Sequence, residues 1–172
     1  MATFQALARS SNTWLNANVL GASGVNRALT LRLIDDLCLE AQKNGGGGYP
    51  SALYSRHVLG QIYADLVRTD RRYSPKEMTL DGGWSAVEVT HPGGKCPWIL
   101  DRMCRPNQVM AVREQDLIYF EQEPIGWMDR DGTILHRALD GTDAYEAKLF
   151  TYSQLGAQRA NSHTLLKDIS ES

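Results

Sequence analysis

Three side chains in the middle of the sequence carry atoms that can bind a metal ion: His91, Cys96 and Cys104. Structural zinc sites are usually built from pairs of cysteines separated by two to four residues. Cys96 and Cys104 have seven residues between them, and no second pair follows. The spacing therefore favours buried or partly exposed thiols over a zinc site.

Ser55, His57 and Asp65 contain the three groups of a hydrolytic triad within one short stretch. A serine hydrolase also needs a sharp nucleophile turn such as Gly-x-Ser-x-Gly and donors for an oxyanion, and the sequence shows neither pattern. We therefore expect Ser55 to cap a helix and His57 to lie on the surface. A small-molecule-binding or hydrolytic α+β domain that uses His57, or the region of His91, Cys96 and Cys104, is kept as an alternative function.

Glycines and acids form three further patterns. The four glycines at 45–48 end a helical pattern and lead into Tyr-Pro without the Gly-Lys-Ser/Thr of a phosphate loop, so a linker is expected. Asp129 and Asp131 precede Gly132, but the closing glutamate of a calcium loop is missing, which favours a hairpin turn. Glu121 and Glu123 are expected to share one solvated strand face. The sequence predicts no catalytic residue, no cofactor and no metal, so we expect a protein that is not an enzyme.

Composition limits the classes of protein that remain. The chain has 172 residues, of which 42% are hydrophobic and 22% charged, as in an ordinary globular domain. Eighteen basic and 20 acidic side chains give a net charge of -2, so no overall field favours nucleic acid or an anionic membrane. Three cysteines without regular spacing predict reduced thiols. No apolar run is long enough to span a membrane, and we expect a cytoplasmic protein.

Periodicity predicts an α+β fold in which helices come first and strands follow. Apolar residues recur at helical spacing from Leu33 to Ala41, with Thr30 as N-cap and Asn44-Gly45 as the stop. A second stripe runs from Val58 to Val67. Strands are expected at 49–54, 84–90, 97–101, 108–112, 116–122 and 143–155, with mainly antiparallel pairing. Neither face of the last strand is cleanly apolar, which is typical of a strand that lies between neighbouring surfaces.

The succession of segments resembles that of tailed-phage major capsid proteins with the HK97-type fold, in their C-terminal portion. The resemblance extends over residues 14–169 and depends on the order and spacing of several short stretches rather than on any single motif. These stretches are Tyr-Pro-Ser-Ala-Leu-Tyr-Ser at 49–55, Asp-Arg-Arg-Tyr at 70–73, the segments 80–89, 96–102, 115–120, 127–132 and 144–156, and Arg159, Asn161, His163 and Ile169.

The resemblance implies a mixed, mostly antiparallel sheet with two or more packed helices and a long closing strand. It divides the chain into an extended lead-in at 1–29, an A-domain-like core at 30–142, and a P-domain-like closing strand and tail at 143–169. Members of the family also carry an N-terminal arm, an extended E-loop and a spine helix. None of these three elements is recognised here, so we expect a fragment or a shortened relative.

The function implied by the resemblance is that of a structural capsid protein, which self-assembles into an icosahedral phage or prophage shell around DNA. An encapsulin-like shell protein is a further alternative. The implied partners are copies of the same chain in pentamer and hexamer rings, with scaffolding, portal and decoration proteins, and local, non-specific contact with DNA. Assembly is expected in the host cytoplasm, with the product in the virion. The expected inter-subunit contact residues are Arg68, Arg71, Arg72, Arg102, Arg105, Glu121, Glu123, Asp129 and Asp131.

Overall fold

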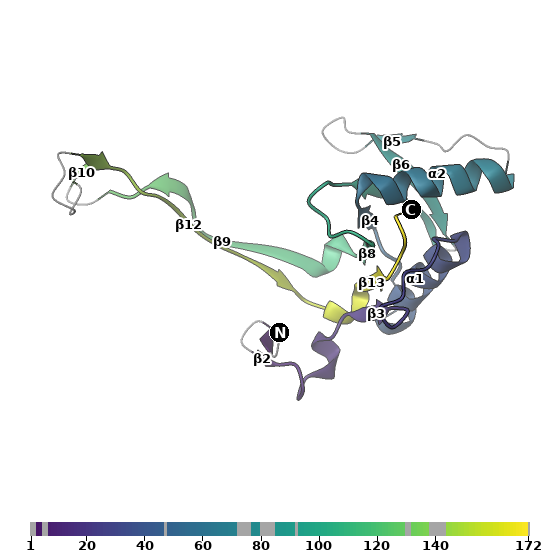
Figure 1. Ribbon diagram of the computed structural model, residues 1–172. Helices are drawn as coiled ribbons and strands as arrows, with labels where there is room; N and C mark the ends of the chain where they lie inside the picture. The colour runs from purple at the N-terminus through teal and green to yellow at the C-terminus, as the bar shows by residue number, and fades with distance from the viewer. Residues whose placement is uncertain are drawn as a thin grey trace. The chain divides into compact units, whose positions relative to one another are not determined.

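The computed structural model describes residues 3–4, 7–46, 48–71, 77–79, 85–91, 93–129, 132–137 and 144–171. By their internal contacts the residues form two units. We call Met1–Asp116 with Gln158–Ser172 the sheet unit, and Leu117–Ala157 the ribbon unit. Figure 1 labels their helices and strands.

The sheet unit is built on a seven-stranded sheet in the order β3-β13-β8-β4-β7-β6-β5. Pairing is parallel between β3 and β13 and between β4 and β7, and antiparallel elsewhere, which confirms the expected mixed, mostly antiparallel sheet. The strands, in this order, are Asn18–Leu20, Thr164–Lys167, Gln108–Val112, Ala52–Ser55, Gly94–Leu100, Ser85–His91 and Glu77–Thr79. Edge strand β3 comes from the segment expected to be an extended lead-in.

The first helix, α1, spans Leu31–Asn44 and begins as predicted. Thr30 has extended backbone angles, and its hydroxyl accepts a hydrogen bond from the Leu33 amide at 3.3 Å. The left-handed residue that follows the helix is Gly46, with φ 76°, rather than Gly45, with φ −89°. The helix therefore ends at Asn44 as predicted, but the left-handed residue follows one position later than predicted.

The second helix, α2, spans His57–Arg71, and Ser55 is not its cap. Ser55 instead ends strand β4, where it is fully buried. Its Oγ accepts a 2.7 Å hydrogen bond from the Trp98 indole on β7 and donates to the Arg56 carbonyl at 3.0 Å. A buried indole N–H needs an acceptor, and that requirement explains the serine at this position.

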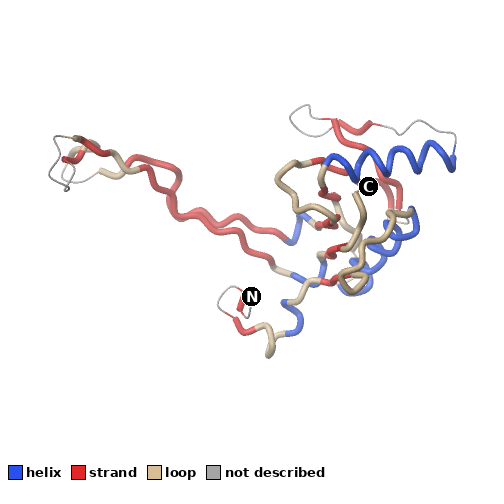
Figure 2. Tube along the Cα trace, viewed as in Figure 1, coloured by secondary structure: helices blue, strands red, loops and turns tan. Residues whose placement is uncertain are grey.

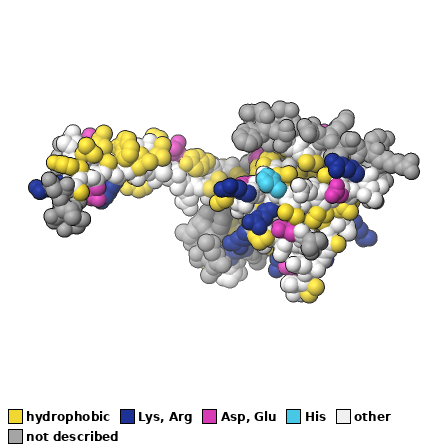
Figure 3. Space-filling model, turned by 45° about the horizontal axis from the view of Figure 1, so that its top comes forward, with side chains coloured by type: hydrophobic (Ala, Val, Ile, Leu, Met, Phe, Trp, Pro, Cys, Tyr) yellow, Lys and Arg dark blue, Asp and Glu magenta, His cyan; other side chains and the backbone are white. Residues whose placement is uncertain are grey.

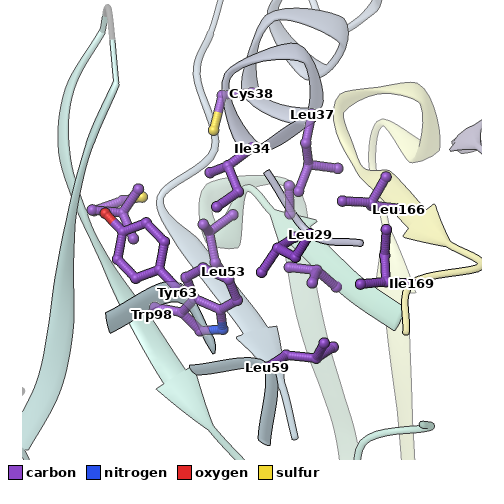
Figure 4. Packing of buried hydrophobic residues seen from close by; sticks show 14 residues of the cluster. Leu29, Ile34, Leu37, Cys38, Leu53, Leu59, Tyr63, Trp98, Leu166 and Ile169 are labelled. Atoms are coloured by element: carbon purple, nitrogen blue, oxygen red, sulfur yellow. The ribbon is translucent and has the colours of Figure 1, made fainter. Parts of the chain in front are cut away.

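The core lies on one face of the sheet. Leu53 of β4 pairs with Trp98 on one side and with Ala111 on the other, and all three side chains are fully buried. Helix α1 contributes Ile34 and Leu37 to the same cluster. Figure 4 shows these side chains with Leu59 and Tyr63 of α2 around Leu53. Both helices therefore pack against the same side of the sheet.

Short elements complete the sheet unit (Figure 2). Near the N-terminus, β1 (Thr3–Phe4) pairs with β2 (Leu7–Ala8), and a 3-10 turn, η1, spans Thr13–Leu15. Two more 3-10 turns, η2 (Glu114–Asp116) and η3 (Ala160–Ser162), flank the ribbon unit along the chain. The Gln158 amide donates to the Asp116 carbonyl at 2.8 Å, so the two ends of the sheet unit that lead to the ribbon lie side by side.

The ribbon unit is a long antiparallel pair, β9 (Leu117–Trp127) with β12 (Leu149–Ala157). A shorter pair, β10 (His136–Arg137) with β11 (Tyr145–Glu146), follows toward the turn. The strand predicted at 143–155 is thus two strands, β11 and β12, and its partner β9 is longer than predicted. Gly132 has φ 83°, as a turn requires, whereas Asp131 lies outside the described residues. The names A-domain-like for 30–142 and P-domain-like for 143–169 stay predictions.

Candidate assembly surface

The ribbon has two faces, and the register of β9 with β12 assigns side chains to each. Directly paired residues in an antiparallel sheet point to the same side. The first face, which we call the Tyr119 face, contains Tyr119 with Leu155, Glu121 with Ser153, and Trp127 with Leu149. The opposite face, the Phe120 face, contains Phe120 with Gln154, Glu123 with Tyr152, and Gly126 with Phe150.

Both faces carry large apolar side chains that are exposed. Seven large side chains of β9 and β12 have exposed fractions between 54% and 69%: Tyr119, Phe120, Ile125, Trp127, Leu149, Tyr152 and Leu155. Hydrophobic side chains lie along the ribbon in Figure 3. Because β9 and β12 pair only with each other among the described strands, the outer edge of each strand has no sheet neighbour. Exposed apolar surface of this kind, with open strand edges, marks an interaction site.

The four acidic contact candidates lie in the ribbon unit. Glu121 and Glu123 are exposed on β9, and Asp129 is exposed just after it. The prediction that Glu121 and Glu123 share a face is wrong. They pair with Ser153 and Tyr152, which are neighbours on β12, because β9 has an extra residue at this point. This β-bulge turns the two carboxylates to opposite faces. Asp131 lies outside the described residues.

The basic contact candidates lie in the sheet unit. Arg68 is exposed on α2 and forms an ion pair with Asp65 at 3.3 Å. Arg102 and Arg105 are exposed in the loop after β7. Arg71 is the last residue of α2, and Arg72 lies outside the described residues. A role of any of these arginines at a subunit contact stays a prediction.

A partly buried polar cluster lies beside η2, where the chain passes from the sheet unit to the ribbon unit. The His163 ring accepts a hydrogen bond at Nδ1 from the Arg113 amide, at 3.2 Å. The Arg113 guanidinium lies 3.8 Å from the buried carboxylate of Asp116. Burial lowers the pKa of His163, and the Asp116 charge partly opposes this shift. These contacts join the residue before η2 to the residue after η3 within the sheet unit.

The residues of the predicted hydrolytic alternative do not come together as a reactive site. Ser55 is buried against Trp98, whereas His57 is exposed at the start of α2. Asp65 forms its ion pair with Arg68 on the exposed side of the same helix. A nucleophile that is hydrogen-bonded to an indole and has no contact with a base cannot be activated in this arrangement.

His91, Cys96 and Cys104 likewise form no metal site. His91 stacks on Tyr49 with ring centroids 5.0 Å apart, and its Nδ1 accepts from the Gly93 amide at 3.1 Å. Cys96 is buried, which raises the pKa of its thiol to about 11, so this sulfur is held protonated. The described part of the chain contains no group of three His, Cys, Asp or Glu side chains that could hold a metal ion. All three cysteines are free.

Sequence reasoning did not identify the exposed aromatic residues of the ribbon as a surface. Their pattern was hidden because the bulge in β9 breaks the two-residue alternation that reveals a strand face. A usable signal was present in the pair Tyr119 and Phe120. Two adjacent aromatic residues in a strand must point to opposite sides. A core that covers only one face of the strand can therefore contain only one of them, and the other is left outside it.

Several solved structures resemble this chain, and two of them are shell proteins of known kind. One is the holo-SrpI encapsulin complex from Synechococcus elongatus PCC 7942, with a TM-score of 0.60, 16% sequence identity and coverage of 90% of this chain and 54% of that one. The other is the capsid asymmetric unit of cyanophage A-1(L), with a TM-score of 0.61, 14% identity and coverage of 98% and 54%. No protein-family model and no curated protein sequence matches the chain.

The chain spans about half the length of the structures that it matches. Both are shell assemblies, in agreement with the expected fold. No described helix is long and apolar enough to cross a membrane. With two helices and a mixed sheet among the described residues, and with these structural neighbours, the chain has an α+β, HK97-type fold.

Proposed function

We propose that the chain is a structural subunit of a protein shell, and that it acts by non-covalent self-association. The observation that carries this proposal is the ribbon, whose two faces both expose large apolar side chains. A monomer with such a ribbon leaves apolar surface in water, and burial against neighbouring copies recovers about 25 cal/mol for each Å² removed from solvent. Association through both faces gives each copy at least two neighbours, as a closed shell requires.

Of the two kinds of shell, we propose a phage or prophage capsid that encloses DNA. The order of segments over residues 14–169 supports this choice, and so does the likeness to a cyanophage capsid. The net charge of -2 limits the chain to local, non-specific DNA contact. Copies of the chain are the principal partners, and scaffolding, portal and decoration proteins complete the capsid. The chain is proposed to assemble in the host cytoplasm and to remain in the virion.

The encapsulin complex has a similar TM-score, and an encapsulin-like shell is therefore the second candidate. The two candidates share the subunit fold and differ in the contents of the shell. Nuclease-sensitive nucleic acid inside purified particles would support the capsid, whereas a co-purified protein cargo would support the encapsulin.

The test is the mass and shape of the purified chain. We expect light scattering to give a mass that rises with concentration to multiples of the 19.2 kDa chain, and negative-stain images to show rings or shells. The paired change Tyr119→Ser with Leu155→Ser removes two exposed apolar groups from one ribbon face and should reduce association at least tenfold. Val25→Ser, at a loop residue that is 69% exposed, is the matched control. A wild-type chain that stays monomeric at every concentration would contradict the proposal.

A further inference from the structure

The sheet unit has a second face that neither helix covers. Residues next to one another along a strand point to opposite sides, so the neighbours of the buried row Trp98, Leu53 and Ala111 must point away from α1 and α2. These neighbours are themselves in register across five strands. The row runs Val19, Leu165, Met110, Tyr54 and Ile99.

Every residue of this row is apolar or aromatic, and none is fully buried. Val19 and Met110 are exposed, and Leu165, Tyr54 and Ile99 are partly exposed. Strands in a sheet lie about 4.8 Å apart, so the row is roughly 19 Å long. We call this row the open stripe. A core row of the same length on the other face is covered by two helices, whereas no described element of the sheet unit covers the open stripe to the same extent.

A hollow lies beside the middle of the open stripe. Its volume is about 340 Å³, and its lining includes Met110 with Met103, Cys104 and Arg105. Methionine side chains are flexible and adapt to irregular apolar partners, which suits a docking surface. Cys104 is partly exposed, whereas Cys38 and Cys96 are buried.

The edge of the open stripe next to the hollow is positively charged. Arg56 lies two residues after Tyr54 on the same strand path, Lys167 lies two residues after Leu165, and Arg105 lines the hollow. Asp101 is the acidic residue of the lining, and its Oδ1 accepts from the Met103 amide at 2.8 Å. Among the described residues, Arg56 and Arg105 form no ion pair, whereas the charge of Lys167 acts on the neighbouring Asp168, so a partner with an exposed carboxylate would complement the two arginines.

The Tyr119 face of the ribbon has the matching length, polarity and charge. From Leu149 to Leu155 a strand advances roughly 20 Å, close to the length of the open stripe. Apolar pairs lie at both ends of this face, Tyr119 with Leu155 and Trp127 with Leu149, and Glu121 lies between them. Glu121 is exposed and has no ion-pair partner in the described ranges.

We propose that the open stripe is the docking site for the Tyr119 face of the ribbon of a second copy of this chain. Glu121 of the incoming ribbon lies against Arg105, and the apolar pairs on either side cover the stripe. This inference rests on the proposed function, because it names the surface that receives the ribbon during self-association. Contacts of this kind are heterologous, so they extend into a ring or a shell rather than stopping at a dimer.

Cross-linking between copies tests the docking directly. Ser153 pairs with Glu121 on the Tyr119 face, and its neighbour Gln154 is also exposed, on the Phe120 face. One population carries Ser153→Cys with Cys104→Ser, and a tagged population keeps Cys104 as its single accessible thiol. With a short bismaleimide, we expect a covalent heterodimer at least tenfold more abundant than with Gln154→Cys in place of Ser153→Cys. Equal yields from both positions would overturn the proposed face.

A charge exchange and an apolar change supply a second, independent measurement. Arg105→Glu should weaken association at least fivefold, and Glu121→Arg in the same chain should restore it. Met110→Glu, at a residue that is 37% exposed on the open stripe, should abolish association, whereas Val58→Glu, 39% exposed on α2, should not. An assembled wild type whose mass is unchanged by Met110→Glu overturns this interface and leaves the shell function standing. A wild type that never assembles overturns both.

Discussion

The buried Ser55 hydroxyl serves as the hydrogen-bond acceptor for the buried indole of Trp98. The indole N–H of Trp98 donates to Ser55 Oγ at 2.7 Å in the middle of the core. We expect Ser55→Ala to leave this donor without a partner and to lower the free energy of unfolding by about 1–3 kcal/mol. Urea unfolding followed by tryptophan fluorescence measures the change.

Thr69→Ala is the control for this prediction, because the Thr69 hydroxyl donates to the Asp65 carbonyl at an exposed position of α2. Its effect should stay within about 0.5 kcal/mol. If both changes cost the same, the buried hydrogen bond contributes nothing specific to the core.

His163 predicts a dependence of stability on pH. Burial lowers its pKa in the folded chain, so the unfolded chain binds a proton more readily and acid favours unfolding. The stability contribution is fully present above the ordinary histidine pKa of about 6.5 and is lost as the pH falls through the lower, folded-state value. His91 is shifted in the same direction by burial and adds to the effect.

The change His163→Asn tests this assignment, because an amide oxygen can still accept from the Arg113 amide but does not titrate. We expect unfolding at a series of pH values to show a smaller loss of stability on the acid side than in the wild type. His57→Asn, the same change at an exposed histidine, is the matched control. A slope that His163→Asn does not reduce would place the titration elsewhere.

At the scale of elements, α1 ends against the turn η3 with no room for a side chain. A Cβ atom at Gly45 would lie 2.6 Å from the Ala41 carbonyl oxygen and 2.8 Å from Ser162 Cα. Both are backbone atoms, so they cannot move aside as a side-chain tip can. We expect Gly45→Ala to cost about 1–3 kcal/mol in the free energy of unfolding, measured by urea titration.

The neighbouring change Lys43→Ala is the comparison, because the Lys43 side chain is exposed and pairs with Glu40 on the helix surface. It should change stability by less than about 0.5 kcal/mol. A Gly45→Ala chain as stable as the Lys43→Ala chain would mean that α1 and η3 separate easily.

The elements that sequence predicts well are those that local residues specify. Thr30 caps α1 through an amide three residues away, and β8 was expected at its observed bounds, Gln108–Val112. Ser55 was assigned wrongly because its partner, Trp98, is 43 residues away. The faces of Glu121 and Glu123 depend on a bulge that the pairing with β12 fixes, about thirty residues further along the chain.

The candidate assembly surface is harder to predict for the same reason. The open stripe joins Val19 to Leu165, Met110, Tyr54 and Ile99, which come from five separate parts of the sequence. The residue pattern of one strand predicts only that one of its faces is less polar than the other. Strand order, which depends on long-range pairing, decides which of these faces combine into a surface.

At the scale of the whole molecule, the sheet unit should fold without the ribbon. The buried residues of its hydrophobic cluster that the structure describes lie within residues 29–111 and 166–169, and the Asp116 carbonyl and the Gln158 amide already meet at 2.8 Å. A two-residue Asn-Gly turn can therefore replace residues 117–157 without stretching the chain.

We expect this shortened protein to unfold cooperatively in urea and to stay monomeric by light scattering at concentrations where the full chain assembles. The shortened chain keeps the open stripe but has no ribbon of its own. It should therefore bind the ribbon of one full-length chain, and that ribbon is then no longer available to a further copy. A shortened chain that still assembles by itself would show that surfaces of the sheet unit, rather than the ribbon, drive association.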